Sequence, residues 1–305
     1  MRISLVVPVY NEEQSIVEFY RQSEAVLTNF DDYEIIFVDD GSSDNSWNII
    51  NSLVQEQAIK HIRAIKLTRN FGHQEAVIAG LKLTTFELIG IIDADLQDPP
   101  SLLLDMCNLI SNDVDIVYGK RISRKGETLF KKFSAMIFYR LFRLVTTFDI
   151  PVDTGDFRVI TKRVTDQVIV LNEQTPFLRG IFAFTGYKSL PYEYSRSERF
   201  GGKSNYNLGK MIKLASNAIF AFSDIPYKLF MRLGFFSFFL SIIFGAYAIL
   251  TAFISGYSSG WLSTFSLILF LGSLNFCFTG LIGKFVIQAL NSTRARPIYF
   301  IDKII

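Results

Sequence analysis

The chain has 305 residues, a formal net charge of +2 and a hydrophobic fraction of 50%. This length allows one catalytic domain of ordinary size with an additional segment. The small net charge argues against nucleic acid as a partner. Two cysteines, Cys107 and Cys277, are too few for a disulfide framework or a thiolate metal site. The mean hydropathy of +0.28 is high for a purely soluble protein, so part of the chain is expected to contact lipid.

The N-terminal part of the chain alternates short apolar segments with amphipathic ones. The apolar segments are rich in Ile and Val, and they predict strands at 3–10, 33–40, 62–68, 87–95 and 115–120. The amphipathic segments predict helices at 12–29, 45–57, 74–84 and 99–110. This alternation predicts an α/β fold with a mostly parallel sheet flanked by helices. Ligands are then expected at the carboxyl ends of the strands.

Two segments mix basic and apolar side chains. They lie at about 128–148 and 207–222, and lysine or arginine recurs among large apolar residues in both. This composition is typical of a helix that lies in the membrane interface. An ordinary buried helix is the alternative interpretation.

The C-terminal part has no Asp, Glu, Lys or Arg between Leu233 and Gly283. This stretch predicts two membrane-spanning helices, at about 233–254 and 262–282, each long enough for a hydrocarbon core about 30 Å thick. Basic residues flank the pair on both sides, and the turn between the two segments is uncharged. The positive-inside rule therefore places both ends in the cytoplasm. The alternative is a buried helical hairpin in a soluble protein.

These segments predict two domains. Residues 1–225 are expected to form a cytoplasmic catalytic domain, since the chain begins on a predicted strand and not on a signal peptide. Residues 226–305 are expected to form a transmembrane hairpin with a short cytoplasmic tail. The expected location is therefore the cytoplasmic membrane, with a multi-pass topology.

Acidic residues lie where three predicted strands end. Glu12 follows the first strand, Asp39 and Asp40 end the second, and Asp93 and Asp95 close the fourth. Carboxylates crowded at one sheet edge repel each other, and a hard divalent cation such as Mg²⁺ or Mn²⁺ would relieve that repulsion.

The acidic motifs also have simpler interpretations. Asp93 and Asp95 would share one face of an extended strand, but an Asp-x-Asp pair also occurs in many surface turns. The second motif is compatible with a turn in which Ser43 or Asp44 caps the following helix.

The motifs together resemble the inverting glycosyltransferases of family 2. Within that family they are similar to the polyprenyl-phosphate branch, which includes dolichyl-phosphate mannose synthases and bactoprenol glucosyltransferases. The paired C-terminal apolar segments are similar to those of the bactoprenol enzymes. The resemblance covers nearly the whole chain and rests on residues 7–12, 39–42, 69–73, 93–99, 155–158 and 196–206.

The resemblance implies a GT-A type, Rossmann-like fold and a role for each matching residue. The nucleobase and ribose of the donor would be held by Pro8, Tyr10, Glu12 and Asp40. Asp93, Asp95 and Gln97 would hold Mg²⁺ or Mn²⁺ and the donor diphosphate, with Asp95 as a catalytic residue. The acceptor phosphate would meet Arg196, Arg199, Lys203 and Ser204.

Some of these assignments stay open. Asp156 matches an acidic residue on the acceptor side, as a base or as a positioning group. The lysine that usually precedes the motif tyrosine is Asn205 here, two residues after Lys203. Whether Lys203 supplies the charge of the missing lysine is left open by the sequence. Arg196 and Arg199 would otherwise form a solvated face. His73, in a matching motif, is either structural or functional.

The implied activity is inverting transfer of a sugar to undecaprenyl or another polyprenyl phosphate, which makes the chain a hexosyltransferase of the cell envelope. UDP-glucose is the favoured donor, with UDP-N-acetylglucosamine, UDP-galactose and GDP-mannose as alternatives. A processive synthase is disfavoured, because the segment from Gln174 to Gly180 lacks the tryptophan of the Gln-x-x-Arg-Trp motif. A non-catalytic membrane scaffold or lipid carrier is the alternative from another class. The expected partners are donor, acceptor, bilayer and further copies of this chain, without nucleic acid.

Overall fold

The computed structural model describes residues 1–56, 61–122, 154–171, 173, 176–195, 243, 253–254, 261–293 and 297–305. The chain divides into two compact units. The first comprises Met1–Ala215 together with Pro297–Ile305, and the second comprises Ser216–Arg296. The C-terminal end of the chain therefore belongs to the same unit as the N-terminal end.

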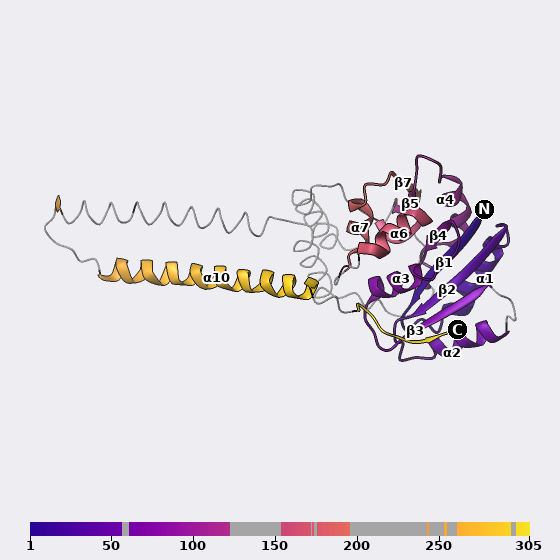
Figure 1. The fold of residues 1–305 in the computed structure, drawn as a ribbon, viewed down its shortest axis with the longest axis horizontal. Coiled ribbons are helices and arrows are strands. Elements are labelled where there is room, and N and C mark those ends of the chain that lie inside the picture. Colours follow the sequence, from indigo (N-terminus) through magenta and orange to yellow (C-terminus); the bar gives the residue numbers. More distant parts are fainter. Residues whose placement is uncertain are drawn as a thin grey trace. The chain divides into compact units, whose positions relative to one another are not determined.

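The first unit contains one mixed β-sheet (Figure 1). Its strands are β1 (Arg2–Val9), β2 (Asp32–Asp39), β3 (Ile62–Leu67), β4 (Leu88–Ile91), β5 (Ile116–Arg121), β6 (Thr154–Thr161), β7 (Ser189–Tyr194) and β8 (Ile301–Ile304). Their order in the sheet is β7-β5-β6-β4-β1-β2-β3-β8. The neighbours among β1 to β4 pair in parallel, as do β5 and β7. β6 is antiparallel to both β4 and β5, and β8 is antiparallel to β3.

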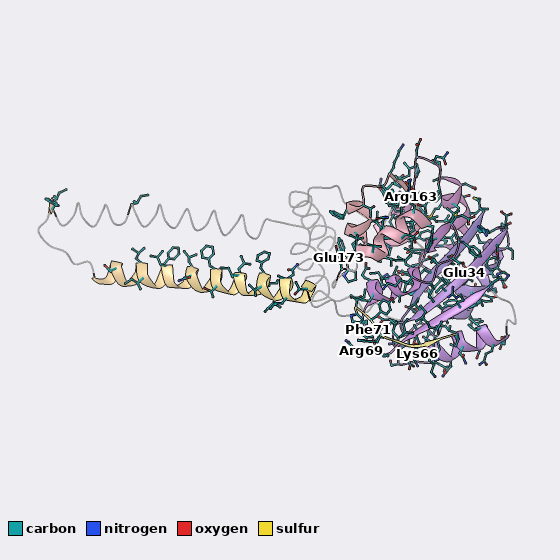
Figure 2. All side chains as sticks on the ribbon, in the orientation of Figure 1. Glu34, Lys66, Arg69, Phe71, Arg163 and Glu173 are labelled. Carbon is teal, nitrogen blue, oxygen red and sulfur yellow. The ribbon has the colours of Figure 1, made fainter. Side chains whose placement is uncertain are left out.

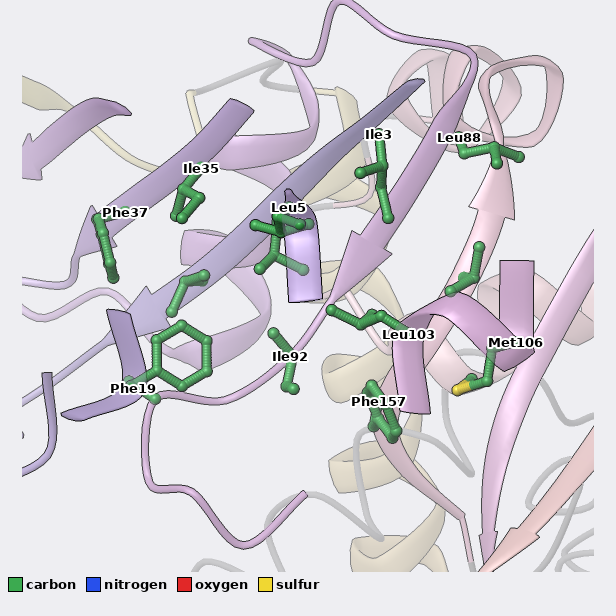
Figure 3. Close-up of a cluster of buried hydrophobic side chains, with 14 of the residues drawn as sticks. Ile3, Leu5, Phe19, Ile35, Phe37, Leu88, Ile92, Leu103, Met106 and Phe157 are labelled. Atoms are coloured by element: carbon green, nitrogen blue, oxygen red, sulfur yellow. The ribbon is translucent and has the colours of Figure 1, made fainter. Parts of the chain in front are cut away.

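Helices cover this sheet on both faces. They are α1 (Ile16–Leu27), α2 (Ser46–Glu56), α3 (His73–Leu81), the 3-10 turn η1 (Pro100–Leu102), α4 (Leu103–Asn108), α6 (Lys162–Leu171) and α7 (Leu178–Phe184). One face carries a core to which α1, α2 and α4 contribute, around residues such as Leu5 and Phe37 (Figure 3). The other face carries α3, where Ala76 packs with Ile36 and Val38. Successive strand residues point to opposite faces, which is why the buried part of β2, residues 35–38, is apolar without interruption.

The predicted helices and strands before residue 122 are confirmed, with ends that differ by a few residues. The expected sheet is confirmed in part: the neighbours among β1 to β4 are parallel, but the sheet as a whole is mixed, because β6 enters between β4 and β5 in the opposite direction. Local periodicity reports which segments are strands, but not which distant strand becomes a neighbour. The C-terminal strand β8 was not predicted either.

The fourth strand is shorter than predicted, and this changes the placement of Asp93 and Asp95. β4 ends at Ile91, and the last ladder bond of this segment runs from the Ile92 amide to the Val6 carbonyl at 3.1 Å. The two aspartates therefore lie in the loop beyond the strand and not on one face of it. Leu96, with a φ of 58°, turns the chain in this loop.

The second unit contains one long described helix, α10 (Trp261–Thr293). It includes the second predicted span, 262–282, so that segment is helical as predicted. None of the helices in the described ranges combines the length and apolar character that a bilayer crossing requires. The two predicted interfacial helices, and nearly all of the first predicted span, lie outside the described residues.

Candidate active site

The acidic motifs of the sequence meet at one edge of the sheet. β4, β1 and β2 are adjacent and parallel, so the loops that follow them leave from the same edge. β6 runs in the opposite direction beside β4, with Arg158 opposite Ile91. The beginning of β6 therefore lies at this same edge, which brings Asp156 to the loop that carries Asp93.

The loops after β1 and β2 are joined by hydrogen bonds. The Asn11 amide donates to the Ser42 hydroxyl at 3.0 Å, and the Glu12 amide donates to the Ser46 hydroxyl at 2.9 Å. The Ser46 amide in turn donates to Asp44 Oδ1 at 3.0 Å. Asp44 thus accepts a bond from the first amide of α2, while Asn45 stands directly before the helix and its carbonyl accepts from the Ile49 amide at 3.1 Å. These bonds hold the first two predicted donor-binding segments in one fixed arrangement.

Asp40 anchors the loop that leads into α3. Its side chain is buried, and its Oδ1 accepts from the Phe71 amide at 2.8 Å while its Oδ2 accepts from the Gly72 amide at 3.0 Å. The Asn70 side-chain amide also donates to Oδ2, at 2.9 Å. Burial is the main cause that raises the pKa of Asp40 to about 6, against the opposing effect of these amides. Asp40 therefore has a structural role that the sequence did not reveal. Its nucleotide contact stays a prediction.

Gly41 permits the close approach of this loop. Its φ is +66°, a region that favours glycine. A Cβ at this position would lie 2.6 Å from the Asn70 backbone nitrogen and would also meet the backbone of Arg69. The glycine of the Asp-Asp-Gly-Ser motif is therefore required sterically.

Asp93 lies where several negative charges converge. Its Oδ1 is buried and accepts no hydrogen bond from the described residues. Burial, followed by the charges of Asp95, Asp156 and Asp98, raises its pKa to about 6 although His73 acts in the opposite direction. Such a carboxylate is under electrostatic stress that a cation would relieve.

His73 stands between two of these carboxylates at the start of α3. Its Nε2 lies 3.6 Å from Asp93 Oδ1 and 3.3 Å from Asp156 Oδ2. Burial lowers the pKa of His73, but the two carboxylates outweigh that effect and raise it to about 9. His73 is therefore cationic at neutral pH. His73 therefore pairs with Asp93 and Asp156 as well as forming the first residue of α3.

Asp156 is the most heavily paired carboxylate of the site. Arg179 donates from Nε to Oδ1 at 3.0 Å and from Nη2 to Oδ2 at 3.4 Å, and Gln74 donates to Oδ2 at 3.3 Å. Burial raises the pKa of Asp156, but Arg179, His73 and Arg158 hold it well below the ordinary value. A carboxylate held ionised in this way is a weak base. It is better suited to hold other groups in place.

The residues fit a divalent cation that is shared with a bound phosphate. The part of the chain that the structure describes contains no group of three or more His, Cys, Asp or Glu side chains arranged to hold a metal by themselves. Mg²⁺ is commonly held by one or two carboxylates and by substrate phosphates. The buried Asp93 oxygen without a hydrogen bond matches that mode. Asp95 is more constrained, because its Oδ1 accepts from the Gln97 amide at 3.1 Å.

The remaining predicted residues divide into two groups. Pro8 is buried in β1, Tyr10 is exposed just beyond it, and Glu12 and Gln97 are partly exposed at the same edge. The predicted acceptor-phosphate residues, Arg196, Arg199, Lys203 and Ser204, lie outside the described residues. The structure therefore brings together the predicted donor, metal and Asp156 positions.

Comparison with known proteins decides the family. The family model of glycosyl transferase family 2 matches residues 4–169, a segment that contains all three acidic motifs and Asp156. The chain belongs to glycosyltransferase family 2. The protein is therefore a transferase, and its mixed sheet with flanking helices is the GT-A-like part of the chain.

Relatives of this family 2 glycosyltransferase align with it almost from end to end. An uncharacterized glycosyltransferase, YkcC, of Bacillus subtilis is 38% identical over 99% of this chain and 94% of its own length. The bactoprenol glucosyl transferase of Shigella phage SfX is 34% identical over 99% of both chains. The prophage bactoprenol glucosyl transferase homolog of Escherichia coli K12 is 33% identical over 100% of this chain and 99% of its own.

Solved glycosyltransferase structures align more distantly. A mannosyltransferase of Pyrobaculum calidifontis, in complex with GDP-Man and Mn²⁺, is 18% identical with a TM-score of 0.45. The alignment covers 67% of this chain and 58% of that one.

Two residues of the glycosyltransferase site were missed by sequence reasoning. Arg179 lies in the segment that lacks the tryptophan of the processive motif, and neither it nor Gln74 belongs to a motif that carries the family resemblance. Gln74 accepts from the Leu178 amide at 2.9 Å, so it ties α3 to the start of α7 next to Arg179. The arginine inside an apolar segment was the available signal, since a partly buried arginine needs a partner.

Proposed function

We propose that the protein transfers glucose from UDP-glucose to a polyprenyl phosphate, with inversion, at the cytoplasmic face of a membrane. The observation that carries this proposal is the match, over nearly the whole chain, to proteins named bactoprenol glucosyl transferases. The arrangement at the sheet edge supports it. The donor motifs, Asp93 and the paired Asp156 lie together there.

The acceptor chemistry explains why a strong base is unnecessary. A phosphate monoester has a second pKa of about 6 and is ionised at neutral pH, so its oxygen is already a nucleophile. Asp156, whose pKa is held well below its ordinary value, would accept a proton poorly. We therefore assign Asp156 a positioning role, in which it orients Arg179 and His73 around the reacting groups.

The donor side of the site faces the harder task, because the leaving nucleoside diphosphate gains negative charge as the sugar bond breaks. When bound, Mg²⁺ or Mn²⁺ offsets that charge directly. Asp93 and Asp95 are the residues that would hold it. In the metal-free site, His73 supplies positive charge at the same edge, 3.6 Å from Asp93.

A single displacement follows from one fixed acceptor position. The acceptor oxygen attacks the anomeric carbon from the face opposite the diphosphate, so an α-linked donor gives a β-linked product. The site holds the two substrates in line, so the entropy cost of bringing them together is met on binding and not in the chemical step.

Membrane attachment is part of the proposal, because a polyprenyl chain stays in the bilayer and its phosphate must be met at the headgroup level. The support is the uncharged sequence from Leu233 to Gly283. Connectivity agrees with it, since the first unit contains both residue 215 and residue 297. A hairpin that begins and ends on the same side of the membrane would suit this connectivity. The interfacial helices at about 128–148 and 207–222, and a homo-oligomeric state, remain predictions.

The test is direct identification of the lipid product. Membranes that contain the protein are incubated with undecaprenyl phosphate and, separately, with labelled UDP-glucose, UDP-N-acetylglucosamine, UDP-galactose or GDP-mannose. We expect a β-linked glucosyl lipid phosphate from UDP-glucose and no product with the Asp95→Asn variant. Transfer of another sugar would change the donor assignment. No transfer from any donor would contradict catalysis and favour a scaffold.

A further inference from the structure

The C-terminal strand lies along an edge of the catalytic sheet. β8 pairs with β3, placing Ile304 opposite Ile65. The Ala64 amide donates to the Ile305 carbonyl at 2.8 Å, and the Ile305 amide returns a bond to the Ala64 carbonyl at 2.9 Å. β8 thereby pairs the edge of β3 and becomes the last strand of the sheet, a short edge of four residues.

The tail also reaches beyond the end of β3. The Thr68 amide donates to the Phe300 carbonyl at 3.0 Å, and Thr68 immediately precedes the loop of residues 69–72. The Phe300 ring lies 6.2 Å from the Phe71 ring. Figure 2 labels Lys66, Arg69 and Phe71 on this side of the sheet, where the C-terminal strand runs.

The loop of residues 69–72 is the loop that Asp40 binds. Phe71 is held from three directions: its amide donates to Asp40 at 2.8 Å, its ring meets Phe300, and the Arg69 guanidinium lies 4.2 Å from its ring centroid. Gly72, the next residue, also donates to Asp40, and α3 with His73 begins directly after it. A change in the position of Phe71 would therefore reach Asp40, Arg69 and His73.

We infer that Phe300 is a positioning residue for the nucleotide site: the C-terminal strand holds Phe71 so that the loop of residues 69–72 keeps Asp40 in place for the donor. This inference rests on the proposed function, which locates the nucleotide at this edge. Phe300 itself contacts no reacting group. Because β8 follows the segment that contains α10, the strand also links that segment to the nucleotide site through a few residues of chain.

The physical basis is that the contact with Phe300 reduces the number of conformations open to the loop of residues 69–72. Without the Phe300 ring, the Phe71 ring keeps the Arg69 guanidinium beside it but loses this aromatic contact, and the loop gains conformations in which its amides leave Asp40. Such conformations lower the apparent affinity for nucleotide by the fraction of molecules that adopt them. Tyr299 adds a second contact, with the Lys82 ammonium 5.2 Å from its ring centroid.

The experiment compares Phe300→Ala with Ile304→Ala in the full-length protein. Both side chains belong to the tail and are more than half exposed, but Ile304 lies at the far end of β8, opposite Ile65. We expect Phe300→Ala to raise the dissociation constant for UDP, measured with Mn²⁺ by calorimetry, by about twofold to tenfold, the range that an aromatic pair corresponds to. The KM for the donor should rise with it while kcat and the urea midpoint change little. Phe300→Tyr, which keeps the ring, should restore affinity.

Linkage supplies a second readout. If the tail favours the nucleotide-binding loop, bound UDP must stabilise the tail by the same free energy. We expect UDP to slow hydrogen exchange at the Thr68 and Ile305 amides in the wild type, and less so in Phe300→Ala. Equal UDP affinity in Phe300→Ala, Ile304→Ala and the wild type would overturn the inference. Failure of the wild type itself to bind any nucleotide would instead contradict the proposed function.

Discussion

Arg179 and Asp156 form a two-pronged ion pair that joins the start of α7 to the start of β6. The Nε–Oδ1 distance is 3.0 Å and the Nη2–Oδ2 distance is 3.4 Å. The planar guanidinium matches the two carboxylate oxygens, which fixes orientation as well as charge. Asp156 is only 8% exposed, so the pair holds a charged group rigidly at the edge where Asp93 lies. This ion pair supports the positioning role that we propose for Asp156.

Asp156→Asn is expected to lower kcat by about tenfold to a hundredfold, because the groups around it lose their fixed positions. Turnover should rise with pH at about pH 6 in both proteins, because the acceptor phosphate ionises in that range. The measurement is a pH–rate profile of each protein with saturating acceptor. Loss of the rise in the variant alone would show that Asp156 is the titrating base, and unchanged turnover would deny it any essential role.

Asp93→Asn should stabilise the fold while it removes metal-dependent donor binding. The folded-state pKa of Asp93, about 6, lies above its ordinary value because of burial and the neighbouring carboxylates. The ionised group therefore destabilises the metal-free fold, and stability is lost as the pH rises through about 6. We expect the variant to gain about 1 kcal/mol in its free energy of unfolding at pH 7.5, after allowance for solvent screening.

Urea unfolding in EDTA at pH 7.5 and pH 5 tests this electrostatic prediction, because the gain should shrink at the lower pH. UDP titration with and without Mn²⁺ tests the metal role. The matched control is Asp166→Asn, an exposed carboxylate on α6 that pairs with Lys162. A variant at position 93 that is less stable than the wild type, yet binds UDP with Mn²⁺ normally, would contradict both expectations.

Gly41→Ala is expected to destabilise the protein more than Gly186→Ala. Both glycines have positive φ values, +66° and +71°, so each alanine carries a conformational cost of about 1 kcal/mol. The Cβ at position 41 would in addition collide with the backbone of Arg69 and Asn70, whereas a Cβ at position 186 would meet no atom of the described residues within 4 Å. The total for Gly41→Ala should therefore reach about 3 kcal/mol.

Chemical denaturation of the two variants measures this difference, and UDP affinity provides a second comparison. Gly41→Ala should weaken UDP binding, because the clash displaces the loop that Asp40 holds. Gly186→Ala should leave it unchanged. Equal destabilisation by the two substitutions would mean that the loop yields without cost.

Ile268→Lys and Ile287→Lys test the proposed membrane segment. Both isoleucines belong to α10, and each side chain is 61% exposed. Position 268 lies within the predicted span and position 287 lies beyond it. A lysine near the middle of a span costs about 3 kcal/mol on insertion scales, so Ile268→Lys should lower recovery in the washed membrane fraction. Equal recovery of the two variants would argue against a span at 262–282.

Much of the site could be predicted from the sequence, because its motifs follow strands. Asp40 and Asp93 come directly after apolar segments, and β4, β1 and β2 proved to be adjacent and parallel. Their meeting at one edge follows from the geometry of parallel βα units. The loop position of Asp93 could not be predicted, because the apolar run continues past the last residue of the strand.

Other features depended on contacts between distant segments. Asp156 reaches Asp93 because β6 inserts antiparallel beside β4, and Arg179 reaches Asp156 because Gln74 fixes the start of α7. Neither relation leaves a periodic trace in the chain. The pairing of β8 with β3 is equally invisible, since a short apolar end is compatible with many positions.

The sequence by itself determined the βα units, the acidic edge and the family, because these depend on local periodicity and on motifs of fixed spacing. Only the tertiary structure decided which strands became neighbours, which carboxylate was paired by Arg179 and which was left beside other negative charges. The physical reason is that pairing, burial and charge compensation are set by residues far apart in the chain. Their energies exist only once the fold brings those residues together.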